Sequence, residues 1–250
     1  MKAVILAAGV GSRLGRPYPK SLSLLPSGER ILGRQIRIFR ESGIKEIIVV
    51  VGFKMGLIME EYPSVFYKYN PTFYISNTSK SLLAALQDLD DDVIWINGDV
   101  VFDPQVIEEL LRAEPNAVAV DRKKCSDEEV KYRTDFKGRI LEISKQVFMP
   151  EGEAVGVNKV GRLDLKAFTK SLDECEDNDY FEKGLELLVK QGLFFKAVDI
   201  SEYRCIEVDF ETDYQEAQKM FAVYNGQNIN AVPVKQRKNY LPLACNSIAL

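Results

Sequence analysis

Histidine is absent from all 250 residues of this sequence. Without imidazole there can be no Ser-His-Asp or Cys-His nucleophile, no histidine general base and no imidazole metal ligand. The four cysteines (Cys125, Cys175, Cys205 and Cys245) form no C-x-x-C pair. That spacing argues against a zinc ribbon or a redox dithiol and favours incidental thiols in a reducing cytoplasm. Any chemistry must therefore use carboxylates, lysine, arginine and the backbone.

A long apolar segment and an excess of positive charge are also missing. The apolar stretch after Met1-Lys2 is too short to span a membrane and lacks a small-residue cleavage site, so we expect a cytoplasmic protein with no membrane partner. The 33 Lys and Arg residues against 37 Asp and Glu give a net charge of −4, which argues against a nucleic-acid partner. At 46% hydrophobic and 28% charged residues, the composition is that of a globular protein with one large core or two small ones.

Apolar segments of strand length alternate with amphipathic helical segments through the first 97 residues. The pattern predicts strands over 3–8, 46–52, 65–70 and 93–97, with helices over 31–43, 54–61 and 81–89. Such β-α-β alternation is typical of a parallel sheet covered on both faces. Functional side chains are then expected at the carboxyl ends of the strands.

The regular alternation of strands and helices ends in the second half of the sequence. We expect a helix over 104–112, a strand over 117–120 and an antiparallel hairpin around Lys137-Gly138. A strand over 154–161, helices over 164–173 and 180–191, strands over 194–199 and 205–208, and a last helix over 211–222 follow. The prediction is an α/β protein with a Rossmann-like, mixed but mostly parallel central sheet and helices on both faces.

A glycine-containing segment follows the first strand. Gly9 and Gly11 would let backbone N–H groups approach an anion, and Arg13 and Lys20 would supply positive charge for a polyphosphate. The alternative is an ordinary glycine turn with two solvated cations. The segment is not a P-loop, because Pro19 precedes Lys20 where that motif has glycine, and it lacks the third glycine of a dinucleotide fingerprint.

Carboxylates occur at two further strand ends. Asp99 follows the apolar strand 93–97, and Glu207 and Asp209 have the spacing that places both side chains on one face of a strand. Oxygen ligands of this kind suit Mg²⁺ bound to a triphosphate. The alternatives are helix caps: Asp99 for the helix near residue 104, and Thr212 or Asp213 as the explanation of the acids near 209.

Polar residues over 76–81 lead into a predicted helix. Free amides and side-chain donors at a helix N-terminus suit a base edge, a ribose or an anion. Ordinary N-capping by Thr78 or Ser79 is the structural alternative.

These motifs together resemble a known family. AVILAAGVGSRL with a following PK, GD after an apolar strand, and E-x-D before the last helix are similar to nucleoside triphosphate transferases of the sugar-nucleotidyltransferase type, over residues 1–222. The segments NP…SNTSKSL and IEVDFETDY are most similar to the cytidylyltransferases that activate phosphocholine, inositol 1-phosphate or 2-aminoethylphosphonate. The resemblance implies a GT-A-like fold, CTP as donor and Mg²⁺ as cofactor.

The resemblance also implies roles for particular residues. Arg13 and Lys20 would act on the phosphates as catalytic residues, and Asp99, Asp209 and Glu207 would hold Mg²⁺. The nucleotide would be bound by Leu6, Ala7, Ala8, Gly9, Gly11, Ser12, Asn77 and Ser81. Thr78 and Lys80 depart from the residues that are usual at their positions in the phosphocholine branch.

The acceptor is predicted from the aromatic residues and the cations. Trp95, the only tryptophan, belongs to a core strand, which leaves Tyr180 as one aromatic wall and no cage for a quaternary ammonium. Lys131, Arg133 and Lys159 would meet a phosphate or phosphonate dianion. We therefore expect 2-aminoethylphosphonate first, inositol 1-phosphate second and phosphocholine third. The alternatives are a uridylyl- or guanylyltransferase acting on a sugar 1-phosphate, and a nucleotide-sensing domain without activity.

The last segment, 223–250, contains Gly226, Pro233 and Pro242 and a basic stretch over 235–238. We expect it to be a linker to a further enzymatic domain, or an arm that packs on a neighbouring subunit of a homodimer.

Overall fold

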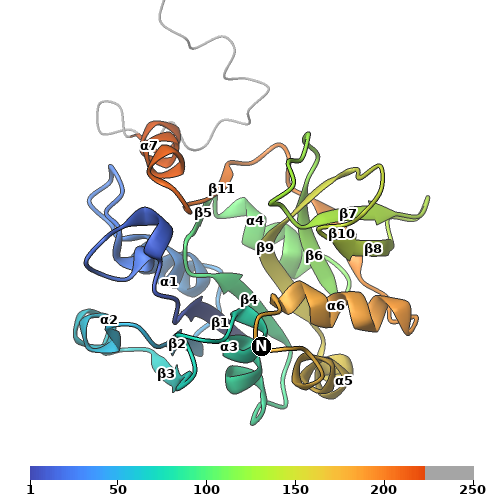
Figure 1. Ribbon diagram of the computed structural model, residues 1–250, viewed down its shortest axis with the longest axis horizontal. Helices are drawn as coiled ribbons and strands as arrows, with labels where there is room; N and C mark the ends of the chain where they lie inside the picture. Colours follow the sequence, from blue (N-terminus) through green and yellow to red (C-terminus); the bar gives the residue numbers. More distant parts are fainter. Residues whose placement is uncertain (223–250) are drawn as a thin grey trace, which may run out of the picture.

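The computed structural model describes residues 1–222, so the tail predicted for 223–250 lies outside the described residues. Within them, nine strands form one sheet, and seven follow one another in the order β10-β6-β9-β4-β1-β2-β3 (Figure 1). These seven are β1 (Lys2–Ala7), β2 (Ile47–Val51), β3 (Phe66–Tyr69), β4 (Val93–Asn97), β6 (Ala117–Asp121), β9 (Gly152–Val160) and β10 (Lys196–Asp199). Only β9 of this series pairs antiparallel with its neighbours, so the expected mixed, mostly parallel α/β sheet is confirmed.

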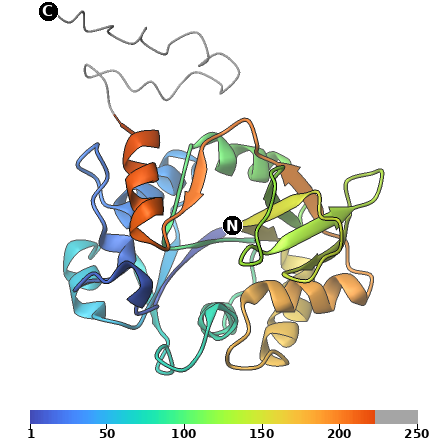
Figure 2. The same ribbon diagram turned by 45° about the horizontal axis from the view of Figure 1, so that its top comes forward.

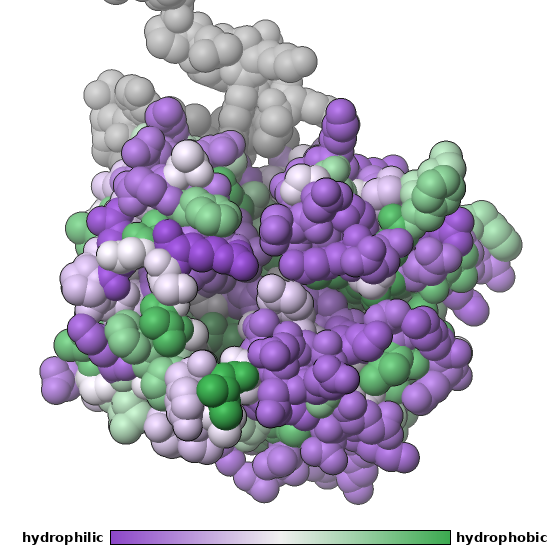
Figure 3. Space-filling model, viewed as in Figure 1, coloured by the Kyte–Doolittle hydropathy of each residue, from purple (hydrophilic) through white to green (hydrophobic). Residues whose placement is uncertain are grey.

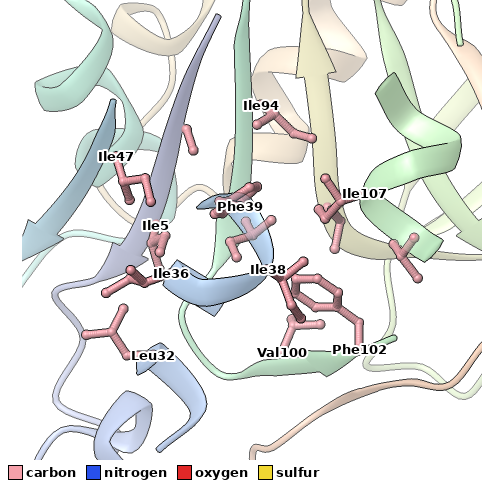
Figure 4. Close-up of a cluster of buried hydrophobic side chains, with 14 of the residues drawn as sticks. Ile5, Leu32, Ile36, Ile38, Phe39, Ile47, Ile94, Val100, Phe102 and Ile107 are labelled. Carbon is pink, nitrogen blue, oxygen red and sulfur yellow. The ribbon is translucent and has the colours of Figure 1, made fainter. Parts of the chain in front are cut away.

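Helices cover both faces of this sheet because the strands are apolar on both sides. One core cluster joins the sheet to α1 (Ile31–Glu41), α2 (Met55–Glu61) and α4 (Gln105–Arg112). Figure 4 shows its centre, where Ile36 and Phe39 of α1 lie close to Ile5 of β1. The opposite cluster joins the sheet to α3 (Thr78–Leu86), α5 (Arg162–Asp173) and α6 (Phe181–Lys190). Trp95 lies in this second cluster, 4.9 Å from the ring of Phe168, as expected for a core residue.

The β7 (Lys131–Thr134) and β8 (Ile140–Ser144) hairpin extends the sheet beyond β9. Gly138 stands at its turn with φ +74°, a left-handed conformation that glycine adopts without strain, so the hairpin expected around Lys137-Gly138 is confirmed. In Figure 2 the hairpin lies on the same side of the molecule as α6.

A second, two-stranded sheet was not expected from the sequence. It pairs β5 (Val100–Phe102) antiparallel with β11 (Cys205–Glu207). After β11 the chain enters α7 (Glu211–Met220), which packs with the 3-10 helix η1 (Ser12–Leu14) in a third apolar cluster; the other short helix, η2, spans Lys20–Leu22. This small sheet brings residues near 100 and near 208 to the edge where β1 and β4 end.

None of the helices among residues 1–222 has the length and apolar character needed to cross a membrane. Figure 3 shows that hydrophilic side chains cover most of the face seen in Figure 1.

Candidate active site

A cavity of about 370 Å³ opens at the carboxyl ends of β1 and β4. Its walls come from the glycine segment after β1, the turn after β4, the N-terminus of α3, the strands β9 and β11, and the loops around Lys145 and Tyr180. Most residues predicted to act on the nucleotide line it: Leu6, Ala7, Gly9, Gly11, Ser12, Arg13, Lys20, Asn77, Asp99, Glu207 and Asp209.

Gly11 allows Lys20 to reach this cavity. Its φ is +64°, and a Cβ atom at this position would lie 2.5 Å from Cγ of Lys20. The side chain of Lys20 therefore passes directly against the Gly11 backbone, which only glycine permits. Arg13, from η1, lies 3.4 Å from Asp209 through its Nη1 atom.

Lys20 is paired with two carboxylates. Its Nζ atom lies 2.9 Å from Asp99 Oδ2, donates to Asp209 Oδ1, and lies 3.3 Å from the carbonyl oxygen of Val208. Burial by itself lowers the pKa of this ammonium, but the charges and hydrogen bonds of Asp99 and Asp209 outweigh burial, so the pKa is raised above its ordinary value. Lys20 is therefore a permanent cation between two anions.

The β5-β11 pair explains how Asp99 and Asp209 meet. Val100 lies opposite Glu207 in the antiparallel register, and the backbone N–H of Val208 donates to the carbonyl oxygen of Asp99 at 3.0 Å. Asp99 directly precedes β5 and Asp209 comes shortly after β11, so the two aspartates lie at the same end of the small sheet.

The capping alternatives are resolved by Asp213. Its Oδ2 atom accepts from the backbone N–H groups of Asp209 and Phe210, at 3.0 and 2.7 Å, and so caps α7. Asp209 is thereby free to face Lys20. Asp99 caps no helix, since α4 begins after Pro104 without a side-chain cap.

Glu207 is the third carboxylate of the group. Its Oε1 atom accepts from Asn97 Nδ2 at 3.4 Å. Burial and the neighbouring charges of Asp99 and Asp209 raise the pKa of Glu207 well above its usual range. The neutral form of Glu207 is thereby favoured, and the charges of Asp99 and Asp209 are balanced by Lys20 and Arg13.

The carboxylate oxygens around Lys20 are candidate ligands for Mg²⁺. Among residues 1–222, no three Asp, Glu, Cys or His side chains are grouped closely enough to enclose a metal ion. Two carboxylates nevertheless share one cation, the Lys20 ammonium, and hard oxygen donors are what Mg²⁺ prefers. Asp99 and Asp209 fit Mg²⁺ as two protein ligands and would hold it beside Glu207, where it would draw electron density from bound phosphates.

Ala8 and Ser81 lie behind the cavity wall. Ala8 is buried, and its carbonyl oxygen accepts from the Phe53 N–H at 3.0 Å. The Ser81 hydroxyl accepts from Asn70 Nδ2 at 3.0 Å. Neither residue lines the cavity, so the geometry favours a supporting position for both, and the direct nucleotide contact expected of them stays a prediction.

The helix α3 begins at Thr78, three residues before the predicted start, because Asn77 caps it through the Thr78 N–H. The Thr78 hydroxyl accepts from the Phe181 N–H at 3.0 Å, and Lys80 Nζ donates to the carbonyls of Asp173 and Cys175. The two residues that depart from the phosphocholine branch therefore fasten α3 to the segment that carries Tyr180.

The three cations predicted for the acceptor do not line the cavity. Lys131 Nζ donates to the Lys145 carbonyl at 2.9 Å, and Lys159 Nζ to the Ala113 carbonyl at 2.9 Å, where it closes the end of α4. Arg133 pairs with Glu142, which lies opposite it in the β7-β8 register. Each of the three cations is held by a structural partner, so this geometry does not support their predicted role at the acceptor.

Tyr180 does line the cavity, beside residues that the sequence reasoning missed: Glu128, Glu129, Lys145, Glu153 and Glu182. Burial raises the pKa of the Glu182 carboxyl to about 7, even though its own backbone N–H and Lys145 favour the charged form. A Tyr-x-Glu at the start of a predicted helix was the one available signal for Glu182.

Known proteins resemble this chain in sequence and in fold. Residues 3–152 match the model of the MobA-like NTP transferase domain. The chain is 30% identical over 245 residues to a CMP-5'-(3-aminopropyl)phosphonate synthase from Streptomyces rubellomurinus, an alignment that covers 89% of this chain and 39% of that protein. It is 27% identical over 252 residues to a CTP:phosphoglutamine cytidylyltransferase from Campylobacter jejuni, covering 86% of this chain and 98% of the relative.

The fold is similar to that of the inositol-1-phosphate CTP transferase from T. maritima, with a TM-score of 0.74, 16% identity, and coverage of 88% and 95% of the two chains. At that identity the similarity concerns the fold alone. The family match spans more than half of the sequence, and it agrees with the motifs that point to nucleoside triphosphate transferases. The chain therefore belongs to the MobA-like NTP transferase domain family.

Proposed function

We propose that this chain is a cytidylyltransferase that transfers CMP from CTP to a small phosphonate or phosphorylated alcohol and releases pyrophosphate. The observation that carries the proposal is Lys20, held between Asp99 and Asp209 at the mouth of the glycine segment. Two relatives whose names specify CMP or CTP chemistry align over most of the chain and support cytosine as the base.

The reaction needs no general base. An acceptor phosphonate or phosphate is largely ionised near pH 7, so one of its oxygens can attack the α-phosphorus of CTP directly. The new bond forms as the bond to the α,β-bridging oxygen breaks, and pyrophosphate leaves with the electron pair. The absence of histidine is compatible with this chemistry.

The protein's task is to hold two anions together and to neutralise charge in the transition state. Backbone N–H groups of the segment 9–12 would bind the triphosphate, and Lys20 and Arg13 would turn from their aspartate partners toward its oxygens. Mg²⁺, held by Asp99 and Asp209, would draw electron density from the phosphates. Glu207 would keep Asn97 in place beside them.

We propose 2-aminoethylphosphonate as the first acceptor to test, before inositol 1-phosphate and phosphocholine. Lys131, Arg133 and Lys159, on which the predicted order of acceptors was based, do not line the cavity. Two other observations support the same order. Tyr180 and Phe210 are the aromatic residues among those lining the described cavity, too few for a cage around trimethylammonium. The Streptomyces relative is named for an aminoalkylphosphonate product.

The proposal is tested with purified protein, Mg²⁺, each of the four nucleoside triphosphates and the acceptor panel, followed by ³¹P NMR. We expect a phosphonate–phosphate anhydride signal and pyrophosphate with CTP. Faster turnover of UTP or GTP with a sugar 1-phosphate would favour the alternative transferase. CTP binding without turnover for any acceptor would favour a nucleotide sensor.

A further inference from the structure

The wall of the cavity opposite the glycine segment is acidic. Glu128, Glu129, Glu153 and Glu182 all line it. Two of these carboxylates already have partners: Glu129 Oε2 accepts from the Ser126 N–H at 2.7 Å, and Glu153 Oε1 lies 2.7 Å from Lys123 Nζ. Glu128 is mostly exposed to solvent.

Glu182 differs from these three. The residue is 7% exposed and lines the cavity. Among the residues that the structure describes, none from elsewhere in the chain donates a hydrogen bond to its carboxyl group or forms an ion pair with it, and burial raises its pKa. A buried carboxyl group without a donor is costly unless a ligand supplies one. The carboxyl oxygens of Glu182 can therefore accept further hydrogen bonds, which indicates a ligand that donates them.

A lysine ammonium lies over the ring of Tyr180 in the same cavity. Lys145 Nζ stands 4.6 Å from the centre of the Tyr180 ring, and its charge acts on Glu182. Its only carboxylate partner within 4 Å among the described residues is Glu128, at 3.7 Å. The ammonium of Lys145 is thus weakly held, on a flexible stem, at a place built for a cation.

We propose that Tyr180 and Glu182 bind the primary ammonium group of the acceptor, which takes the place of the Lys145 ammonium. This assignment rests on the proposed function, because it needs an acceptor whose phosphonate end lies near Lys20. Tyr180 and Glu182 line the same cavity as Lys20, so one small acceptor can reach both places. A primary ammonium donates hydrogen bonds to Glu182, whereas a trimethylammonium has no N–H to donate.

The first experiment measures binding directly. Calorimetric titration of the CTP-saturated protein compares 2-aminoethylphosphonate with ethylphosphonate, which lacks only the amine. We expect the amine to improve affinity about 10- to 100-fold, the range of a hydrogen-bonded charge pair. In Glu182→Gln, an isosteric change, this advantage should fall at least 10-fold while the affinity for ethylphosphonate is unchanged. Equal loss for both ligands, or no loss, would overturn the assignment.

The second experiment changes Lys145. In Lys145→Met the internal competitor is removed, so the affinity for 2-aminoethylphosphonate should rise several-fold and that for ethylphosphonate should stay the same. If Lys145 instead binds the phosphonate, both affinities will fall, and the proposal is wrong. Lys190→Met, which removes an exposed lysine on α6, is the matched control and should change neither affinity.

The two proposals can fail separately. A well-bound pair of phosphonates with no CMP transfer would contradict the cytidylyltransferase and leave the ammonium site supported. CMP transfer with equal affinity for both phosphonates would contradict the ammonium site and leave the cytidylyltransferase supported.

Discussion

Lys20 illustrates how one residue can be fixed by charge and yet be available for catalysis. Its three oxygen partners occupy all the hydrogens of an ammonium group, and burial makes that arrangement tighter than a surface ion pair. A bound triphosphate would offer more negative charge than the two aspartates. The two aspartates therefore keep the Lys20 amine protonated while no CTP is bound.

We expect Lys20→Met to reduce kcat by about 10²-fold or more, the scale for losing one charge that stabilises a developing anion. Circular dichroism should show an unchanged fold. Lys68→Met, which removes a surface cation paired with the exposed Asp88, is the control and should keep full activity. Normal turnover in Lys20→Met would remove this residue from the mechanism.

Asp99→Asn and Asp209→Asn should each abolish Mg²⁺-dependent turnover, because an amide is a poor ligand for a hard cation. Raising the Mg²⁺ concentration should restore little. A titration of rate against Mg²⁺ for both variants, with Asp88→Asn as a surface control, measures the effect. Unchanged metal dependence in either variant would show that the two-carboxylate site is misassigned.

Glu182 predicts a pH dependence of stability. Its pKa rises from 4.5 to about 7 on folding, mainly through burial. The stability contributed by the protonated carboxyl is fully present below pH 4.5 and is lost as the pH rises through 7. Glu182→Gln should therefore be more stable than the wild type at pH 8, by up to about 3 kcal/mol, and nearly equal to it at pH 4. Urea denaturation at both pH values tests this, and an equal difference at both would contradict it.

At the scale of secondary-structure elements, the end of β11 and the start of α7 work together. The Asp213 cap uses the N–H groups of Asp209 and Phe210, so one side chain both starts the helix and sets the backbone that carries Asp209. Asp213→Ala should cost about 1 kcal/mol of stability, as other N-terminal caps do. It should also weaken Mg²⁺ dependence only slightly, unlike Asp209→Asn. Thermal unfolding and the same Mg²⁺ titration separate the two effects.

A strand can be predicted from the sequence where a local hydrophobic pattern determines it. Strand 93–97 was predicted with its observed bounds, because a fully buried strand needs a continuous apolar run. The strand predicted over 205–208 is confirmed as β11, but its three-residue partner β5 was not expected, because it is too short for a periodic signal and pairs with a strand about a hundred residues away.

In the candidate site, too, some residues could be predicted from the sequence and others could not. Lys20, Asp99 and Asp209 stand at motif positions that sequence shows. The acceptor wall depends on register and on side-chain direction, so Lys131, Arg133 and Lys159 could not be distinguished by sequence from Lys145, which does reach the cavity. A strand residue one place along points to the opposite face.

At the scale of the whole molecule, the cavity is more acidic than the chain. Among the described residues, seven acidic side chains line it (Asp99, Glu128, Glu129, Glu153, Glu182, Glu207 and Asp209) against three cations (Arg13, Lys20 and Lys145). The raised pKa values of Glu182 and Glu207 reduce their share of the negative charge, but the acidic side chains still outnumber the cations. CTP is itself an anion and must enter a cavity in which acidic side chains outnumber basic ones. Divalent metal is therefore expected to be needed for nucleotide binding as well as for the chemical step.

Residues 223–250 give a prediction about domain organisation. Phe221 is buried against the third core cluster, so a truncation that spares the fold must fall after Ala222. Under the linker hypothesis, the protein ending at Ala222 should keep nearly full CMP transfer. Loss of a dimer in light scattering, or loss of folding, would favour an arm on a neighbouring subunit. Loss of kcat alone, with folding intact, would contradict both hypotheses.

The β5-β11 sheet also determines when the site can exist during synthesis. The hydrogen bond between Lys20 and Asp209 spans 189 positions, and Asp99 meets Val208 only after β11 has paired with β5. A nascent chain on the ribosome will thus have its glycine segment and the strands β1 to β4 long before it has the proposed metal-binding pair. Protein made from a message truncated before Cys205 would carry most of the fold and none of the predicted catalysis.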